Sequence, residues 1–329
     1  TKLTLADAVR DVLTKPLDIN WIDSLSADFF EIGISAILND SRRRCVPAES
    51  VFELLEEAYK VGRTGPKLKA LYAEQLWLRG RLGEASGVLE QMSAPSNIQS
   101  KCDALKGAIA FLSGDTEGAI AHYKKGLKAS GKSQRAQVEW FQHPATLLYF
   151  FALLQVGSTE TLKEAEKHVL LIQRNTDHWL TPTAPVLFAV IQQQQSKQTA
   201  GAQRFSQYKL SSVGLVALLE TYCLHWLQID DIEAWMSLQL PWQCQQLTTS
   251  GYHWLALEMT QLLVSYQPES PFAKQTETLR RKINSIPLVD IVERKEAWER
   301  SLDALTALAG PSANEPPPLS LEPTYRLIW

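Results

Sequence analysis

The eight residues from Gly126 to Ser133 come closer to a known chemistry than any other stretch of the sequence. They match the phosphate-binding pattern G-x-x-x-x-G-K-[ST]. In that pattern backbone amides surround a phosphate, Lys132 contacts its oxygens and Ser133 binds magnesium. The chemistry also requires a buried strand before the glycines, whereas residues 117–125 have a helical pattern. We therefore interpret the match as a coincidence at a helix end, and expect no nucleotide or other cofactor.

Side chains that could bind a metal or act as nucleophiles are scattered. Cys223 and His225 are the only close Cys/His pair, and on a helix they would point to different faces. The sequence contains no His-Glu-x-x-His zinc motif and no Gly-x-Ser-x-Gly nucleophile motif. The four cysteines show no Cys-x-x-Cys spacing, which is typical of reduced thiols in a cytoplasmic protein. The sequence thus predicts neither a metal site nor an enzyme.

Composition and charge narrow the function classes further. The chain has 329 residues, of which 45% are hydrophobic, and a net charge of −3. This balance argues against a dominant nucleic-acid surface, which requires clustered Lys and Arg. There is no signal peptide, and the longest apolar run, around residues 145–156, is too short to span a bilayer. We expect a cytoplasmic protein with no membrane contact.

Two copies of one pattern organise the sequence between residues 66 and 131. Gly80 and Ala85 recur 34 residues later as Gly114 and Ala119, and 34 residues is the length of the tetratricopeptide (TPR) repeat. The glycine would end a first helix in a left-handed conformation, and the alanine would let a second helix approach closely. The fold class predicted is all-α, a TPR-like α-solenoid of stacked antiparallel helix hairpins. The aromatic residue that starts the TPR pattern is missing from both copies, so these repeats are degenerate.

The helical period continues on both sides of the repeats. The helices expected before them are a short one from Thr4, then Trp21–Leu38 and Pro47–Val61. A third hairpin would join Val138–Val156 to Leu162–Ile172 through an inserted loop near Ser158, and a fourth would join Val186–Gln198 to Ala200–Leu210. The later helices expected are Val213–Leu227, Ile232–Leu240 up to a break or kink at Pro241, Tyr252–Tyr266, Phe272–Ile286 and Val289–Leu308.

These elements suggest four regions. Residues 1–65 would be an N-terminal helical cap, 66–210 TPR-like repeats and 211–309 C-terminal helical hairpins. Residues 310–329 would be a proline-rich linker and the start of a following domain. The chain begins without Met and ends on an apolar run, so we expect it to be part of a larger protein.

Two surfaces could bind a partner. In TPR proteins the first helix of each hairpin lines a concave groove, and here that face would carry Lys67, Glu74, Trp77, Lys101 and Phe111. The basic-plus-asparagine clamp for terminal carboxylates is incomplete, so an internal helix or neighbouring domain fits better than a peptide end. Basic residues form the second surface, which is either solvated or a weak, salt-sensitive contact with DNA. They are Arg42, Arg43, Arg44, Lys124, Lys125, Lys128 and Lys132.

Four of the ten tryptophans lie between residues 211 and 265, at Trp226, Trp235, Trp242 and Trp254. Packing between helices explains such a cluster, and an exposed aromatic anchor for a partner is the alternative.

Several dispersed phrases in the second half carry a resemblance. They are Gly251–Glu258, Leu262-Leu263, Trp298–Leu305 and, after the prolines, Tyr325–Trp329. Together they resemble the region that precedes the motor of bacterial Swi/Snf-type helicases, over roughly residues 211–329. The resemblance implies a non-catalytic amino-terminal portion of a DNA-dependent ATPase, whose partner would be another protein or the C-terminal motor of the same chain. A stand-alone TPR adaptor that binds a peptide is the alternative, and a nucleotide-binding enzyme using Lys132 and Ser133 is a third hypothesis.

Overall fold

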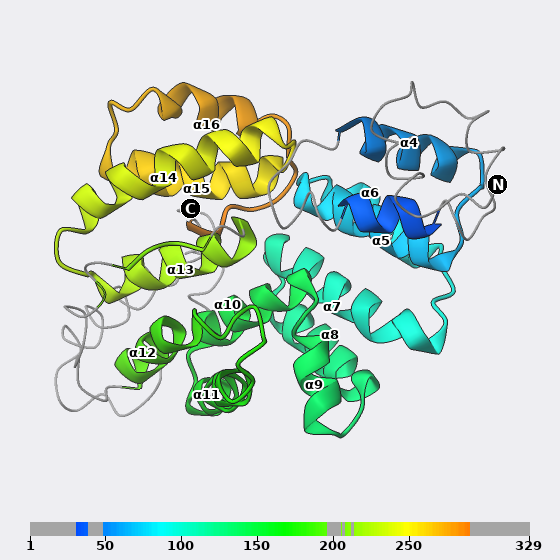
Figure 1. Ribbon diagram of the computed structural model, residues 1–329, viewed down its shortest axis with the longest axis horizontal. Coiled ribbons are helices and arrows are strands. Elements are labelled where there is room, and N and C mark those ends of the chain that lie inside the picture. The colour runs from blue at the N-terminus through cyan, green and yellow to red at the C-terminus, as the bar shows by residue number, and fades with distance from the viewer. Residues whose placement is uncertain (1–30, 39–48, 196–204, 206–207, 212–213, 290–329) are drawn as a thin grey trace, which may run out of the picture. The chain divides into compact units, whose positions relative to one another are not determined.

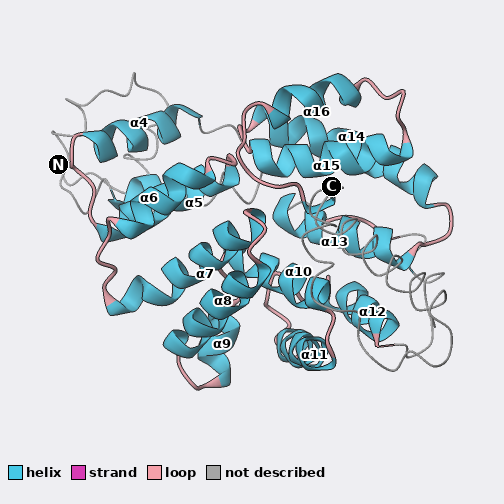
Figure 2. Cartoon of the chain, turned by 180° about the vertical axis from the view of Figure 1, so that it is seen from behind, coloured by secondary structure: helices cyan, strands magenta, loops and turns pink. Residues whose placement is uncertain are grey.

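The computed structural model describes residues 31–38, 49–195, 205, 208–211 and 214–289 (Figure 1). Every regular element among these residues is a helix, as the colouring of Figure 2 shows. Contacts divide the chain into one unit from Thr1 to Leu288 and a second from Val289 to Trp329, and the second lies almost entirely outside the described residues. The predicted all-α class is therefore confirmed. None of the described helices is long and apolar enough to cross a lipid bilayer.

From α4 to α11 the helices follow one another with short connections. Their bounds are α4 Glu49–Lys60, α5 Pro66–Leu78, α6 Leu82–Glu90, α7 Ser96–Leu112, α8 Thr116–Ser130, α9 Gln134–Trp140, the 3-10 helix η1 Pro144–Thr146, α10 Leu147–Val156, α11 Thr159–Gln173, α12 Ala184–Gln194, α13 Gly214–Leu227, α14 Ile232–Thr249, α15 His253–Tyr266 and α16 Phe272–Arg280. Residues 31–38 are also helical. Sequential helices contact one another, as in α5 with α6, α7 with α8 and α14 with α15, which is consistent with stacked hairpins.

The two predicted repeat turns have the same hydrogen bonds, 34 residues apart. After α5, the Arg81 N–H donates to the Leu76 carbonyl at 2.9 Å, and after α7 the Asp115 N–H donates to the Ala110 carbonyl at 2.9 Å. Both turns are Schellman motifs, which require a left-handed residue before the donor. Gly80 supplies it with φ 77° and Gly114 with φ 88°. The glycine prediction is confirmed, and so is the close helix approach, because Ala85 and Ala119 are fully buried.

The third hairpin differs from its prediction. Residues 138–156 do not form one helix, because α9 ends at Trp140 and η1 starts at Pro144, a residue that cannot donate a helical hydrogen bond. No loop is inserted near Ser158. The Ser158 hydroxyl instead accepts from the Thr161 N–H at 3.2 Å and caps α11, directly after Gly157 closes α10 in a left-handed conformation.

Two later boundaries were also wrong. Helix α14 continues through Pro241 to Thr249: residues on both sides of the proline, including Trp235 and Leu247, are buried, and α14 packs against α15. Helix α16 ends at Arg280 instead of Ile286. The helices expected from Thr4 and over Val289–Leu308, like most of the one over Ala200–Leu210, lie outside the described residues, and residues 208–210 are not helical.

Residues 281–288, which we call the strap, run from the end of α16 back across the repeat turns. The Asn284 N–H donates to the Gly80 carbonyl at 3.0 Å, and the Ile286 N–H donates to the Leu112 carbonyl at 2.7 Å. Asn284 Oδ1 accepts from the Leu82 N–H at 2.6 Å, at the start of α6. The strap thus occupies main-chain groups that a helix end otherwise leaves to water.

Candidate functional site

The segment from Gly126 to Ser133 lies in a helix–turn–helix. Gly126 is inside α8, where an added Cβ would come within 2.9 Å of the Ser100 carbonyl oxygen. Gly131 follows the end of α8, and the Ser133 hydroxyl accepts from the Ala136 N–H at 3.1 Å to cap α9. A phosphate-binding loop needs a strand before its glycines. These residues instead have the geometry of a turn between two helices.

The predicted groove residues are mostly inside the molecule. Trp77 is fully buried and packs on Trp254 of α15, with ring centroids 5.3 Å apart. Phe111 is also buried, and so is Glu74, whose Oε2 lies 3.2 Å from Nε2 of His143. A partner would reach Trp77 only if α15 moved away. The remaining two stay at the surface, where Lys67 pairs with Glu31 at 2.9 Å and Lys101 is exposed.

The basic residues proposed for DNA do not form one free surface. Lys124 pairs with Glu164 at 3.1 Å, and Lys125 pairs with the buried Asp103 at 3.0 Å. Lys128 and Lys132 are exposed. Residues 42–44 lie outside the described residues, so the structure places no arginine of that run.

The tryptophan cluster divides between the two interpretations. Trp254 and Trp235 are buried, the latter donating from Nε1 to the Tyr208 carbonyl at 2.8 Å. Trp242 is 55% exposed on α14, beside Leu238 at 76%. Helix packing therefore accounts for Trp235 and Trp254, and Trp242 is the exposed member.

Burial holds two titratable side chains of the interior in their uncharged forms at neutral pH. Burial raises the pKa of the Cys102 thiol to about 11, which leaves it protonated and unreactive at neutral pH. Burial also lowers the pKa of His178 to about 4. Within the described ranges no group of three His, Cys, Asp or Glu side chains is arranged to hold a metal ion.

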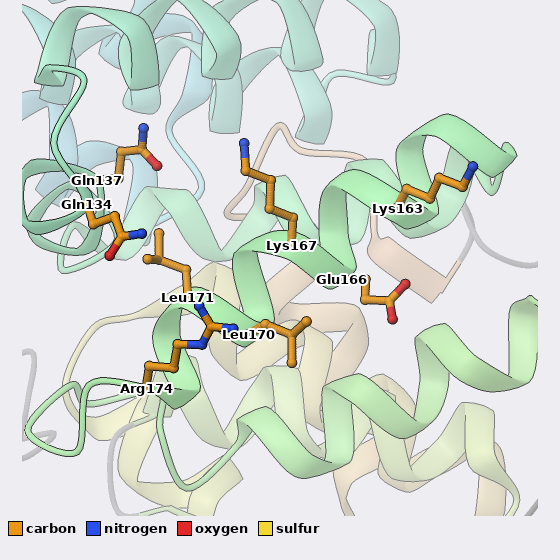
Figure 3. Close-up of a pocket in the computed structure, with 8 residues that line it drawn as sticks. All are labelled: Gln134, Gln137, Lys163, Glu166, Lys167, Leu170, Leu171 and Arg174. Atoms are coloured by element: carbon orange, nitrogen blue, oxygen red, sulfur yellow. The ribbon is translucent and has the colours of Figure 1, made fainter.

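A hollow of about 540 Å³ lies beside α11, with α9 contributing to its wall (Figure 3). Three cations line it: Lys163 and Lys167 from α11 and Arg174 from the residue that caps its end, at spacings of four and seven residues that keep them on one helix face. The half-buried Leu170 and Leu171 add an apolar surface between these cations. The remaining lining residues are Gln134, Gln137 and Glu166.

The hollow offers positive charge that no carboxylate in the described part of the chain pairs with. Among the described residues, Lys163, Lys167 and Arg174 have no ion pair with a carboxylate. Glu166 turns to α12, where its two oxygens accept from Gln192 Nε2 at 3.3 Å and Gln195 Nε2 at 3.2 Å. Cations around a leucine surface are suited to binding an anionic group that also carries apolar atoms.

The opposite side of α11 fixes the helix that carries these cations. Leu162, Ala165 and Val169 are buried there. Burial by itself would raise the pKa of Glu164, but the hydrogen bond from Tyr149, at 2.5 Å, and the ion pair with Lys124, at 3.1 Å, outweigh it and lower the pKa to about 2, with His168 lying 3.8 Å away. Glu164 is therefore ionised at neutral pH and joins α11 to α8 and α10.

Sequence reasoning missed the hollow. The cations of α11 alternate with Glu160, Glu164 and Glu166, so the segment has no run of basic residues. The signal that could have found them is spacing, because positions 163, 167 and 174 share one face of a helix.

Comparisons of the chain with protein-family models, with curated proteins and with solved structures found no match.

Proposed function

We propose that this chain is a non-catalytic helical scaffold with TPR-like hairpins, which forms the N-terminal regulatory part of a bacterial Swi/Snf-type DNA-dependent ATPase. The observation that carries the proposal is the position of the phrase Gly251–Glu258. Its Trp254 is buried against Trp77, and its Glu258 is fully buried and accepts from Tyr222, at 2.6 Å, and from Trp254. Trp254, which belongs to a phrase that carries the resemblance, thus joins the C-terminal helix α15 to α5 of the repeats.

Glu258 also accepts from the Leu288 N–H at 2.9 Å. Leu288 is the last residue of the first unit, and the resemblance places a motor further along the chain. A buried carboxylate with three donors stabilises one arrangement of its surroundings strongly. A region that positions a following motor needs its last residues to be held firmly, and the hydrogen bond between Glu258 and Leu288 holds them.

The alternative is a stand-alone TPR adaptor with a peptide in the groove of its first helices. It has less support, because Trp77 and Phe111 are buried within the protein. The coding sequence after Trp329 distinguishes the two proposals. Helicase motor motifs there would support the regulatory region, whereas a stop codon or an unrelated domain would favour the adaptor.

The proposed absence of catalysis is tested with the isolated chain. We expect no hydrolysis of ATP in the presence of magnesium and no heat of nucleotide binding, since residues 126–133 form a helix end and a turn. Hydrolysis that disappears in Lys132→Ala but persists in Lys101→Ala would contradict the proposal and support a nucleotide-binding enzyme. In the protein that includes the motor, we expect removal of residues 1–288 to change the DNA-stimulated ATPase rate.

A further inference from the structure

We propose that the hollow beside α11 binds an acidic, leucine-containing segment of a partner protein. Carboxylates of the segment would contact Lys163, Lys167 and Arg174, and one or two apolar side chains would contact Leu170 and Leu171. The inference rests on the proposed role as an interaction region. Its test measures binding at the hollow and not ATP hydrolysis, so either proposal can fail without the other.

The arrangement of the cations sets the length of the segment. Lys163 on α11 and Arg174, the residue that caps the end of α11 with helical φ and ψ, are eleven residues apart, which at 1.5 Å per residue is about 16 Å along the helix. A helical peptide of about eleven residues has the same length. Carboxylates spaced three or four residues apart on one face of such a peptide would face the row of cations.

The lining distinguishes a peptide from a nucleic acid. Sites for single strands combine cations with aromatic side chains on which bases stack, and none of the eight lining residues is aromatic. The surface of duplex DNA is a row of phosphates with no apolar projection, so it would leave Leu170 and Leu171 unfilled. Protein interfaces, in contrast, combine an apolar centre with a polar rim.

Charge complementarity supports an acidic partner over a neutral one. The carboxylate in the lining, Glu166, is already hydrogen-bonded to Gln192 and Gln195. The hollow therefore presents cations and the side-chain amides of Gln134 and Gln137 to a ligand (Figure 3). Carboxylates satisfy such donors with charge-assisted hydrogen bonds, which are about twice as strong as neutral ones.

The probe is a synthetic peptide of sixteen residues, built from Glu, Ala and two leucines four positions apart, with fluorescence anisotropy as the measurement. We expect a dissociation constant on the order of 10–100 μM, typical of small interfaces, that rises as salt is added. Lys167→Gln combined with Arg174→Gln should weaken binding about tenfold. The matched control is Lys274→Gln, which removes an exposed charge from α16 and should leave binding unchanged.

A charge exchange makes the test independent of folding. The variant Lys167→Glu with Arg174→Glu should lose the acidic peptide and gain a peptide in which lysines replace the glutamates. Circular dichroism confirms that each variant keeps its helices. Equal binding of the acidic peptide by all variants would overturn the proposal. So would a hollow-dependent affinity for a sixteen-base-pair DNA duplex that exceeds the affinity for the peptide.

Discussion

Glu164 shows at the scale of one residue how this protein stabilises a charge inside a helical array. Its carboxylate accepts a hydrogen bond from Tyr149 on α10 and forms an ion pair with Lys124 on α8. Because the folded pKa of about 2 lies below the ordinary value of 4.5, ionised Glu164 stabilises the folded state. That contribution is complete above pH 4.5 and is lost as the pH falls toward 2.

We therefore predict that Glu164→Gln lowers the free energy of unfolding by about 2 kcal/mol at pH 7. The difference from the unsubstituted protein should shrink when urea unfolding is repeated at pH 3, because pH 3 lies below the ordinary pKa of 4.5 and the carboxyl of the unfolded chain is then mostly protonated. Glu269→Gln, which changes an exposed residue in the turn before α16, is the control and should have little effect at either pH. A pH-independent difference for Glu164→Gln would mean that packing, and not charge, explains its role.

At the scale of elements, the two Schellman turns have equal hydrogen bonds and unequal surroundings. A Cβ added at Gly80 would lie 2.4 Å from Cγ2 and 2.5 Å from Cβ of Ile283, in the strap. One added at Gly114 would meet only Cδ1 of Ile286, at 3.0 Å. The end of a flexible side chain moves easily, whereas a Cβ moves only with its backbone.

We expect Gly80→Ala to lower the free energy of unfolding by about 2–4 kcal/mol and Gly114→Ala to lower it by about 1–2 kcal/mol. Both substitutions place an alanine in the unfavourable left-handed conformation. Only the alanine at position 80 also displaces the strap. Gly87→Ala serves as the control. Gly87 lies inside α6, its added Cβ meets nothing within 4 Å, and the substitution should stabilise by about 1 kcal/mol. Chemical denaturation of the three variants gives the comparison, and equal losses at Gly80 and Gly114 would contradict this account of the strap.

The elements that the sequence predicts well are those with a local cause. The turns at Gly80 and Gly114 follow from glycine and its 34-residue spacing, and α15 was predicted within one residue at its start. Pro241 misled because its effect on α14 depends on tertiary packing, which the local pattern does not contain. The candidate site was missed for a related reason: it needs α9 beside α11, and the break at Pro144 that separates α9 from α10 was not foreseen.

At the scale of the molecule, contacts between distant segments distinguish this protein from a linear array of repeats. In such an array each repeat contacts only its neighbours. Here α15 packs against α5 through Trp77 and Trp254, and Asn284 caps the start of α6. No periodic pattern predicts these contacts, because they join segments with different sequences.

We predict that Asn284→Ala destabilises helices far from it in the sequence. Loss of the acceptor for the Leu82 N–H should lower the free energy of unfolding by about 1–2 kcal/mol. Hydrogen exchange of the α6 amides should accelerate along with that of α16. Asn175→Ala removes a side-chain hydrogen bond within one turn, to the Leu171 carbonyl, and should leave exchange in α6 unchanged. Acceleration confined to the strap would show that the two regions unfold independently.

The contacts of the strap can form only late in the synthesis of the chain. Leu82 and its partner Asn284 are separated by 202 positions, so at about 5–20 residues per second a ribosome needs about 10–40 s to deliver the second after the first. During that interval the nascent repeats have their turns open to water and Trp77 without its stacking partner. A chaperone that shields apolar surface would have its opportunity then, and arrest of translation before codon 283 would leave a chain that cannot finish folding.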